Sequence, residues 1–221
     1  MTTQTQPAIF ILGAGPKIAS AVANLFVKNG NFAVGLSSRS AENLEKYKSL
    51  LPEGTKVATA VADANDPASC VKALDTLKSA LGAPSVVVFN AGSLSLGKKP
   101  IADMTLEDME GHLRMNVVSG FAVMQWGTKN IVKDAEGRAA ILVTGGGLSL
   151  QPREGMSGLA AGKAALINLA KAFKVEAPPT IIVNGFVDTE GWPNHTSPAI
   201  AKDYWDLYTQ KEDEWAYEVM H

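Results

Sequence analysis

Lys163 is the residue with the clearest chemical potential, because it is a cation inside an apolar stretch. Residues 155–166 read GMSGLAAGKAAL, and apolar residues continue at helical spacing as far as about residue 174. A lysine in such a helix either extends its ammonium to solvent or holds a ligand in a cavity. Leu159 lies one helical turn before Lys163, so both side chains share a face of the helix.

A glycine-rich turn near the N-terminus is a candidate for phosphate binding. Residues 12–19 read LGAGPKIA and lie between an apolar run and a helical pattern. Glycine lets backbone approach a phosphate closely, and a helix N-terminus offers free N–H groups and a favourable dipole. The candidate contacts are Gly13, Gly15, Lys17 and Ile18, although Lys17 stands where the dinucleotide pattern more usually has glycine. An ordinary strand–helix turn is the alternative interpretation.

The end of the second apolar run favours NADP over NAD. Residues 36–40 read LSSRS, and the first acidic residue after them is Glu42. An NAD site usually supplies an acid here for the ribose hydroxyls, whereas an NADP site supplies cations and hydroxyls for a 2′-phosphate. Arg39 can make a forked contact with phosphate, and Ser38 can donate a hydrogen bond. The alternative is a solvated turn in which Ser40 caps the next helix.

Alternating strands and helices must position these residues. Continuous apolar runs predict strands at 8–12, 32–36, 56–61, 85–89, 139–143 and 180–183. Helical spacing predicts helices at 17–28, 41–50, 67–81, 105–112, 116–132 and 158–174. Buried strands separated by helices indicate a doubly wound parallel sheet, whose ligand site lies beyond the C-terminal ends of the strands.

The chain is expected to form a single domain. Its 221 residues, 46% of them hydrophobic, are enough for one substantial core, and no repeat or domain linker is apparent. Residues 1–221 are therefore interpreted as one Rossmann-like nucleotide-binding domain of the α/β class. Residues 198–221 are interpreted as a closing helix and cover.

Composition excludes several classes of function. The formal net charge of −2 shows no electrostatic footprint for nucleic acid or for a membrane surface. One cysteine, Cys70, excludes an internal disulfide framework, and three scattered histidines make a zinc site improbable. Neither a membrane-spanning run nor a signal peptide is recognisable. We therefore expect a cytoplasmic protein that acts on a small molecule.

Several short motifs, in the order expected on these elements, resemble the short-chain dehydrogenase/reductase family over nearly the whole chain. The glycine-rich turn is one match, and Asp63 matches the family aspartate that meets the adenine. Asn90-Ala91-Gly92 follows the fourth strand and matches the family's Asn-Ala-Gly signature. Asn116 and Lys163 match the asparagine and the lysine of the catalytic tetrad. The resemblance implies a Rossmann-like fold and a bound nicotinamide dinucleotide.

The resemblance also shows what this chain lacks. In the family, the lysine holds the nicotinamide ribose and lowers the pKa of a tyrosine four residues earlier, which protonates the substrate carbonyl. This chain has Leu159 at the tyrosine position and Gly146 at the position of the family serine. Asn116 and Lys163 of the tetrad remain as candidate catalytic residues. The cofactor-binding half of the site is retained, and the proton-transfer half is missing.

Three hypotheses follow for the function. The first is an atypical NADP(H)-dependent reductase that acts on an activated C=N or C=C bond, such as an iminium, which needs no proton donor. The second is a protein that binds NADP(H) without turnover, as a sensor or assembly partner. The third is a conventional carbonyl reductase with a displaced donor, for which the candidate hydroxyls are those of Thr144, Ser149, Tyr204 and Tyr208.

Other polar and aromatic residues are candidates for the substrate side. Arg153 could stabilise an anion, Asp188 could face the substrate, and Thr189 fits the family position that contacts the nicotinamide amide. The alternative for Arg153 is a surface cation paired with Glu154. Trp192 and Trp205 are candidates for an aromatic wall or for the core, whereas His112 and His195 are expected to be ordinary surface histidines.

The long helices predict self-association. The predicted helices at 116–132 and 158–174 are apolar on more than one face, and only one face of each can cover the sheet. The family resemblance implies dimers or tetramers formed through these helices.

Overall fold

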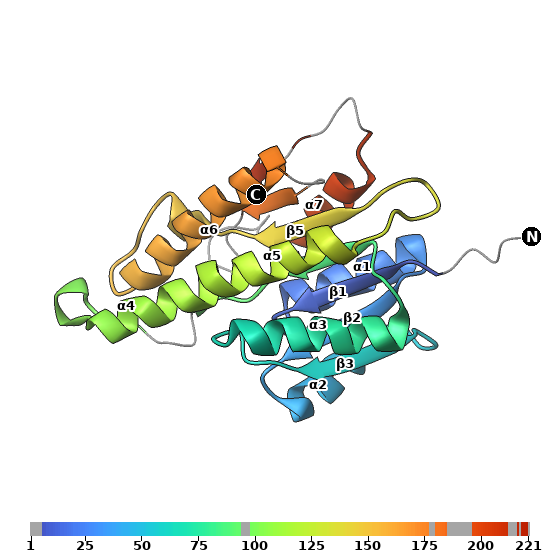
Figure 1. Cartoon of the computed structure of the whole chain (residues 1–221), viewed down its shortest axis with the longest axis horizontal. Coiled ribbons are helices and arrows are strands. Elements are labelled where there is room, and N and C mark those ends of the chain that lie inside the picture. The colour runs from blue at the N-terminus through green and yellow to red at the C-terminus, as the bar shows by residue number, and fades with distance from the viewer. Residues whose placement is uncertain are drawn as a thin grey trace, which may run out of the picture.

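The predicted strands form one parallel sheet. A computed structural model describes residues 6–93, 98–176, 180–184, 196–211, 216 and 218–220. For residues 180–184 and 220 it describes the backbone alone. The strands in this part of the chain lie in the order β3-β2-β1-β4-β5-β6-β7, and all neighbouring pairs are parallel (Figure 1). Their bounds are β1 (Ala8–Leu12), β2 (Ala33–Ser38), β3 (Val57–Val61), β4 (Val86–Phe89), β5 (Ala140–Thr144), β6 (Thr180–Asn184) and β7 (Glu218–Met220). The prediction of a doubly wound, single-domain α/β fold is confirmed.

Helices connect the strands and carry the expected start signals. The helices of the described residues are α1 (Ile18–Gly30), α2 (Ala41–Lys48), α3 (Pro67–Leu81), α4 (Leu106–Leu113), α5 (Ser119–Asn130), α6 (Ser157–Glu176) and α7 (Ser197–Thr209), with short turns η2 (Ile101–Asp103) and η4 (Gly147–Ser149). The Ser40 hydroxyl accepts from Asn43 N and caps α2, while Asp66 caps α3 ahead of Pro67.

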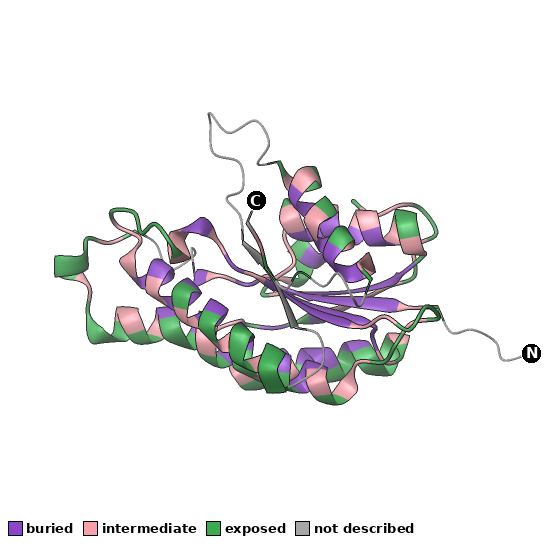
Figure 2. Cartoon of the chain, turned by 90° about the horizontal axis from the view of Figure 1, so that it is seen from above, coloured by how far each residue is buried: buried purple, intermediate pink, exposed green. Residues whose placement is uncertain are grey.

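The sheet is buried because helices cover both of its faces. Along β1, Phe10 faces a core formed with residues of α3, α5 and α6, whereas Ile9 and Ile11 face a second core formed with α1 and α7. This alternation is the two-residue period of a strand. Figure 2 shows the buried strands between helices whose outer surfaces are exposed.

The two helices predicted over 105–132 are one continuous helical segment. A π-helical turn, η3 (Arg114–Val118), joins α4 to α5, so the predicted break near residue 115 is wrong. This segment packs very closely on α6 at two glycines. A Cβ atom on Gly158 would lie 2.1 Å from His112 Cδ2, and one on Gly162 would lie 2.8 Å from Asn116 Nδ2. Glycine at both positions is therefore required by the packing.

The C-terminal part differs from the predicted closing helix. The helix ends at Thr209, and β7 adds a short strand beside β6. Three residues are too few to show periodicity, so this strand could not be recognised from the sequence pattern. Trp205 packs edge-on against Phe26 with ring centroids 5.1 Å apart, so it belongs to the contact between α7 and α1 and not to an aromatic wall.

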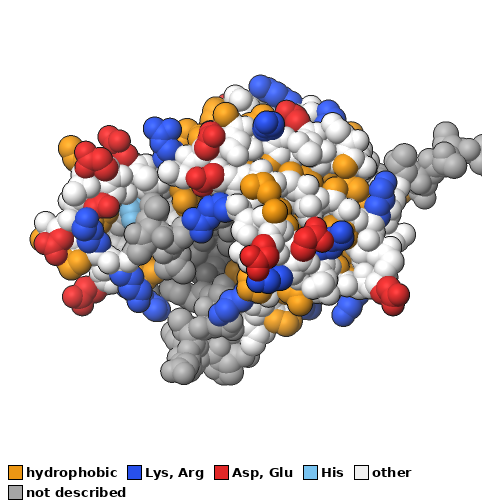
Figure 3. All heavy atoms as spheres, turned by 90° about the horizontal axis from the view of Figure 1, so that it is seen from below, with side chains coloured by type: hydrophobic (Ala, Val, Ile, Leu, Met, Phe, Trp, Pro, Cys, Tyr) orange, Lys and Arg blue, Asp and Glu red, His pale blue; other side chains and the backbone are white. Residues whose placement is uncertain are grey.

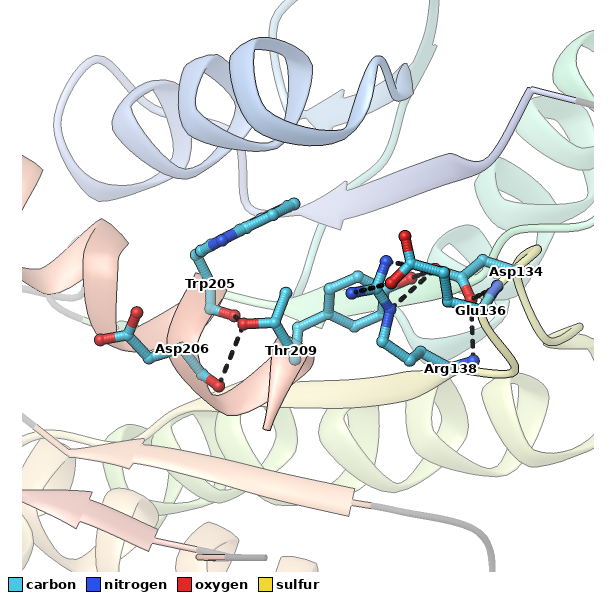
Figure 4. Close-up of polar contacts among 7 residues, drawn as sticks. Asp134, Glu136, Arg138, Trp205, Asp206 and Thr209 are labelled. Atoms are coloured by element: carbon cyan, nitrogen blue, oxygen red, sulfur yellow. Dashed lines mark hydrogen bonds and ion pairs between the residues drawn. The ribbon is translucent and has the colours of Figure 1, made fainter. Parts of the chain in front are cut away.

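A polar cluster fastens α7 to the turn before β5 (Figure 4). The Asp134 carboxylate accepts hydrogen bonds from Tyr208 Oη and Arg138 Nε, and the Arg138 guanidinium lies over the Tyr208 ring. Burial opposes the charge of Asp134, but the hydrogen bonds outweigh it and lower the pKa of the carboxyl group. The cluster holds one end of α7 in place.

The described residues contain neither a membrane-spanning helix nor a group of side chains placed to bind a metal ion. None of their helices is long and apolar enough to cross a membrane. Within the same residues, no group of three or more His, Cys, Asp or Glu side chains is placed to hold a metal ion.

Candidate functional site

The C-terminal ends of β1, β4 and β5 bring the predicted site residues together. Leu12 pairs with Phe89, and Phe89 pairs with Val143, so the residues that follow these strands lie side by side. Asn90 Nδ2 donates to the Gly13 carbonyl oxygen at 2.8 Å, which ties the Asn-Ala-Gly segment to the glycine-rich turn.

Gly13 is required by its backbone conformation and by its neighbours. Its φ of +87° is rare for other residues, and a Cβ atom there would lie 2.5 Å from Ala91 N. The amides of Gly13 and Ala14 both donate to the Ser37 carbonyl oxygen, which fixes the turn against β2. By contrast, a Cβ atom on Gly15 would meet nothing within 4 Å.

A first cavity lies where the glycine-rich turn meets the end of β2. Its volume is about 250 Å³. Its lining comprises Leu12, Gly13, Ala14, Ser37, Ser38, Arg39, Ala62, Ala64, Cys70, Asn90, Ala91, Gly92 and Met115. Asp63 is absent from this described lining, and its carboxylate accepts from Asn65 N, while the neighbouring alanines face the cavity. Burial raises the pKa of the Cys70 thiol to about 11, as suits a structural cysteine.

A second, larger cavity continues from the first, because Asn90 and Gly92 line both. Its volume is about 540 Å³. The lining comprises Gly15, Pro16, Lys17, Ile18, Ala19, Asn90, Gly92, Thr144, Gly145, Gly146, Gly147, Leu148, Arg153, Met156, Leu159 and Lys163. The described lining thus contains three cations and no carboxylate. Figure 3 shows one face of the molecule, on which lysine and arginine side chains lie among acidic and apolar ones.

Lys163 holds its ammonium group at the boundary between this cavity and the sheet. Its side chain is 7% exposed, and Nζ donates to the Thr144 carbonyl oxygen at 2.8 Å and to the Ala91 carbonyl oxygen at 3.2 Å. Burial lowers the pKa of Lys163 to about 8, because desolvation disfavours the charged form. Lys163 is therefore a buried cation at the cavity wall and not a lysine that extends to solvent.

Leu159 and Gly146, which the sequence predicts at the positions of the family's tyrosine and serine, both line the second cavity. Leu159 lies one turn before Lys163 on α6 and contributes an apolar wall. Gly146 precedes η4 with a φ of +149°, a conformation that residues with a side chain rarely adopt. The backbone at this point therefore disfavours any residue with a side chain.

Asn116 is a packing residue of η3 and does not line either cavity. Its Nδ2 donates to Ser93 Oγ at 2.8 Å and to the His112 carbonyl oxygen at 2.9 Å, and its Oδ1 has no partner. The expectation that His112 lies on the surface is wrong. The missing side chain of Gly158 leaves room for the ring, and Nδ1 lies 2.6 Å from Ser93 Oγ. Burial lowers the pKa of His112.

The remaining predicted residues divide into two groups. Arg153 lines the second cavity, as predicted for a residue of the substrate side. Asp188, Thr189, Trp192 and His195 lie outside the described residues, so their predicted roles stay predictions.

Most candidate hydroxyl donors are committed or remote. Ser149 Oγ donates to the Gly146 carbonyl oxygen, and Tyr208 Oη donates to Asp134. Thr144 lines the second cavity, but its hydroxyl donates to Asn90 Oδ1 at 2.9 Å and lies 2.5 Å from Tyr204 Oη. The contact between Tyr204 and Thr144 could not be predicted from the sequence, because the two residues are far apart in the chain.

The two cavities fit a dinucleotide. A pyrophosphate needs open space beside a glycine-rich backbone and free N–H groups at a helix start. The backbone of Gly13 lies close to that of Ala91, the space beside Gly15 is open, and no side chain caps the start of α1. Ser38 and Arg39 would face the adenosine ribose, and Asn90 and Lys163 the nicotinamide half. When bound, a reduced nicotinamide supplies hydride. The residues of this chain would orient it and hold its charges.

Comparison with known proteins identifies the family. A model of the short chain dehydrogenase family matches residues 7–197. A short chain dehydrogenase/reductase of Cryptosporiopsis sp. (strain 8999), dmxR12, is 28% identical over 181 residues, covering 76% of this chain and 70% of the fungal protein. The chain belongs to the short-chain dehydrogenase/reductase family, whose members are oxidoreductases.

Solved structures share the fold. The alcohol dehydrogenase of the archaeon Thermococcus sibiricus, in complex with 5-hydroxy-NADP, is 23% identical and has a TM-score of 0.82; the match covers 98% of this chain and 96% of that one. A short chain dehydrogenase of Burkholderia cenocepacia J2315, in complex with NADP, is 21% identical with a TM-score of 0.80 and coverages of 99% and 97%. At this level of identity the similarity concerns the fold.

The lowered pKa of Lys163 makes a testable contribution to stability. Between pH 8 and 10.5 the unfolded lysine binds a proton that the folded one does not, so its charge destabilises the fold at lower pH and this cost disappears as pH rises. The shift from 10.5 to about 8 corresponds to about 3 kcal/mol. The free energy of unfolding of the wild type, minus that of Lys163→Met, is therefore expected to increase by about this amount across the window.

Urea denaturation at several pH values measures this difference. Lys28→Met, at an exposed lysine of α1, is the matched control, and its difference from the wild type is expected to stay flat. A flat difference for Lys163→Met as well would show that the ammonium is well solvated in the folded protein.

Proposed function

We propose that the chain is an NADP(H)-dependent reductase that acts on an activated C=C or C=N bond, or on a strongly polarised carbonyl, of a small organic molecule. The observation that carries this proposal is the pair Leu159 and Lys163 on one wall of the second cavity. The cation that would hold the nicotinamide ribose is in place, while an apolar side chain stands where the family has its proton donor.

The preference for NADP(H) rests on Ser38 and Arg39. Both line the first cavity, and no acidic residue is part of its described lining. An arginine at the end of β2 can pair with a 2′-phosphate, whereas a carboxylate would repel it. The structural relatives in complex with NADP and 5-hydroxy-NADP support this proposal by similarity of fold.

Replacing Arg39 tests the cofactor preference directly. Arg39→Ala is expected to weaken NADPH binding about 10- to 100-fold, the range for losing hydrogen bonds to a charged group, while NADH binding changes little. Fluorescence titration gives both dissociation constants. Lys46→Ala, at an exposed lysine of the adjacent α2, is the control for a general loss of positive charge. Equal weakening of NADPH by both variants would contradict the assigned role of Arg39.

The chemistry is restricted because no hydroxyl of the described cavity wall is available as a proton donor. Reduction of a simple ketone creates an alkoxide, which must be protonated or stabilised. This stabilisation is commonly the largest single contribution to the rate enhancement. The hydroxyl of Thr144 is committed to Asn90, and Ser149 is not part of the cavity wall. An acceptor that delocalises the arriving charge has less need of such a donor.

The charge of the described cavity wall refines the choice of acceptor. The Lys163 ammonium contributes positive charge, which disfavours a preformed iminium and favours a neutral acceptor that becomes anionic. A conjugated C=C bond beside a carbonyl or carboxyl group meets both conditions. We therefore place such an acceptor ahead of the iminium suggested by the lack of a donor.

A panel of acceptors tests this assignment. With NADPH, the wild type is expected to reduce a conjugated enone at least about 100-fold faster than an unactivated ketone, because reduction of the ketone depends on an acid catalyst. Leu159→Tyr is expected to increase ketone reduction, and Leu159→Phe controls for the ring without the hydroxyl. The loss of NADPH absorbance measures each rate. An equal increase of the ketone reduction rate in Leu159→Tyr and Leu159→Phe would show that the tyrosine hydroxyl does not cause the increase.

Two alternatives make different predictions in the same assay. A sensor would bind NADPH and turn over no acceptor; the open 540 Å³ cavity favours an enzyme over a binder whose substrate space is filled. A conventional carbonyl reductase would reduce simple ketones readily in the wild type. That function is disfavoured because Tyr204 is fully buried and Tyr208 is bound to Asp134.

We propose that the protein acts in the cytoplasm as a homodimer or homotetramer. Val118 and Phe121 remain 48% and 41% exposed where η3 passes into α5, and the Phe121 ring contacts that of Phe173 on α6. A second copy of this surface would cover them. Light scattering is expected to give an oligomer for the wild type and a smaller species for Phe121→Glu. A wild-type monomer at micromolar concentration would refute self-association.

A further inference from the structure

A chain of side-chain hydrogen bonds runs from α7 to the glycine-rich turn. Tyr204 Oη lies 2.5 Å from Thr144 Oγ1, Thr144 Oγ1 donates to Asn90 Oδ1 at 2.9 Å, and Asn90 Nδ2 donates to the Gly13 carbonyl oxygen at 2.8 Å. The first residue belongs to the C-terminal helix, and the other three belong to the cavity walls.

The Gly13 carbonyl oxygen determines which group donates and which accepts in each of these hydrogen bonds. A carbonyl oxygen can only accept, so the Asn90 amide must present Nδ2 to Gly13 and Oδ1 to Thr144. An amide oxygen is also only an acceptor, and the single hydroxyl hydrogen of Thr144 is therefore used on Asn90. It follows that Tyr204 must donate to Thr144.

Burial makes Tyr204 a permanent donor. Its side chain is fully buried, and burial raises the pKa of the phenol well above its usual value, so the hydroxyl keeps its proton throughout the accessible pH range. A hydroxyl in a low-dielectric interior interacts more strongly than one in water, and neighbouring bonds in a chain reinforce each other. The Thr144 carbonyl oxygen also accepts from Lys163, so one residue contacts both halves of the site.

We infer that Tyr204 is a positioning residue of the nucleotide site: through Thr144, it fixes the carboxamide of Asn90 against the glycine-rich turn. The inference rests on the proposed binding of NADP(H) and adds to it the C-terminal helix as a third support of the cofactor. Without the Tyr204 hydroxyl, Thr144 can rotate toward the cavity, and Asn90 loses its fixed orientation.

Tyr204→Phe removes the hydroxyl and keeps the ring. We expect NADPH to bind about five- to tenfold more weakly, the effect of losing a buried hydrogen bond that orders a ligand site. Tyr208→Phe is the matched control, since it makes the same change on the same helix at a hydroxyl that donates to Asp134. It is expected to lower thermal stability and to leave the dissociation constant of NADPH unchanged.

Thr144 variants separate positioning from general structure. Thr144→Ser keeps the hydroxyl and is expected to bind NADPH like the wild type, while Thr144→Val is expected to match Tyr204→Phe. The double variant Tyr204→Phe/Thr144→Val is expected to bind NADPH no more weakly than the weaker single variant. Both changes interrupt the same series of hydrogen bonds, so their effects do not add. The side-chain amide resonances of Asn90 are expected to shift in Tyr204→Phe and not in Tyr208→Phe.

The outcomes distinguish this inference from the proposed function. Failure of the wild type to bind NADPH would overturn the proposed function, and the Asn90 resonances would still decide the inference. Unchanged NADPH binding in Tyr204→Phe, or equal weakening in Tyr208→Phe, would overturn the inference while the cofactor site stands.

Discussion

The structure depends on accommodating one buried charge, the Lys163 ammonium, where the parallel strands end. Desolvation opposes the charge, and the carbonyl oxygens of Ala91 and Thr144 compensate for only part of the lost hydration. Both carbonyls are available because β4 and β5 end at neighbouring positions of the sheet. A charge kept at such a cost needs a reason outside the core, and the cofactor that we propose for the adjacent cavity would provide one.

Close contacts at three glycines prepare the rest of the site. Gly13 lets the first turn meet the segment after β4, while Gly158 lets α6 approach the His112 ring of α4 and Gly162 lets it approach Asn116 of η3. These contacts bring Lys163, Asn90 and the glycine-rich turn to one edge of the sheet. The hydrogen bonds from Tyr204 through Thr144 then link that edge to α7, which Asp134 fastens at its far end. The site is thus supported by elements from both ends of the chain.

Most of the fold, and several residues that line the two cavities, could be predicted from local patterns. Apolar runs identified β1 and β4, and short motifs identified Gly13, Asn90 and Lys163 without any knowledge of tertiary contacts. The failures are features that depend on distant partners. His112 is buried because Gly158 leaves room for it, and Tyr204 meets Thr144 only after the sheet has formed. Strand β7 is too short to leave a periodic signal.

The backbone at Gly146 decides from which side this cavity could be redesigned. A φ of +149° can be held by glycine and by few other residues, so a side chain at position 146 would require the loop after β5 to change its path. Position 159 lies on α6, where a different side chain changes the shape of the cavity wall without changing the backbone. New chemistry is therefore easier to introduce from the helix than from the loop.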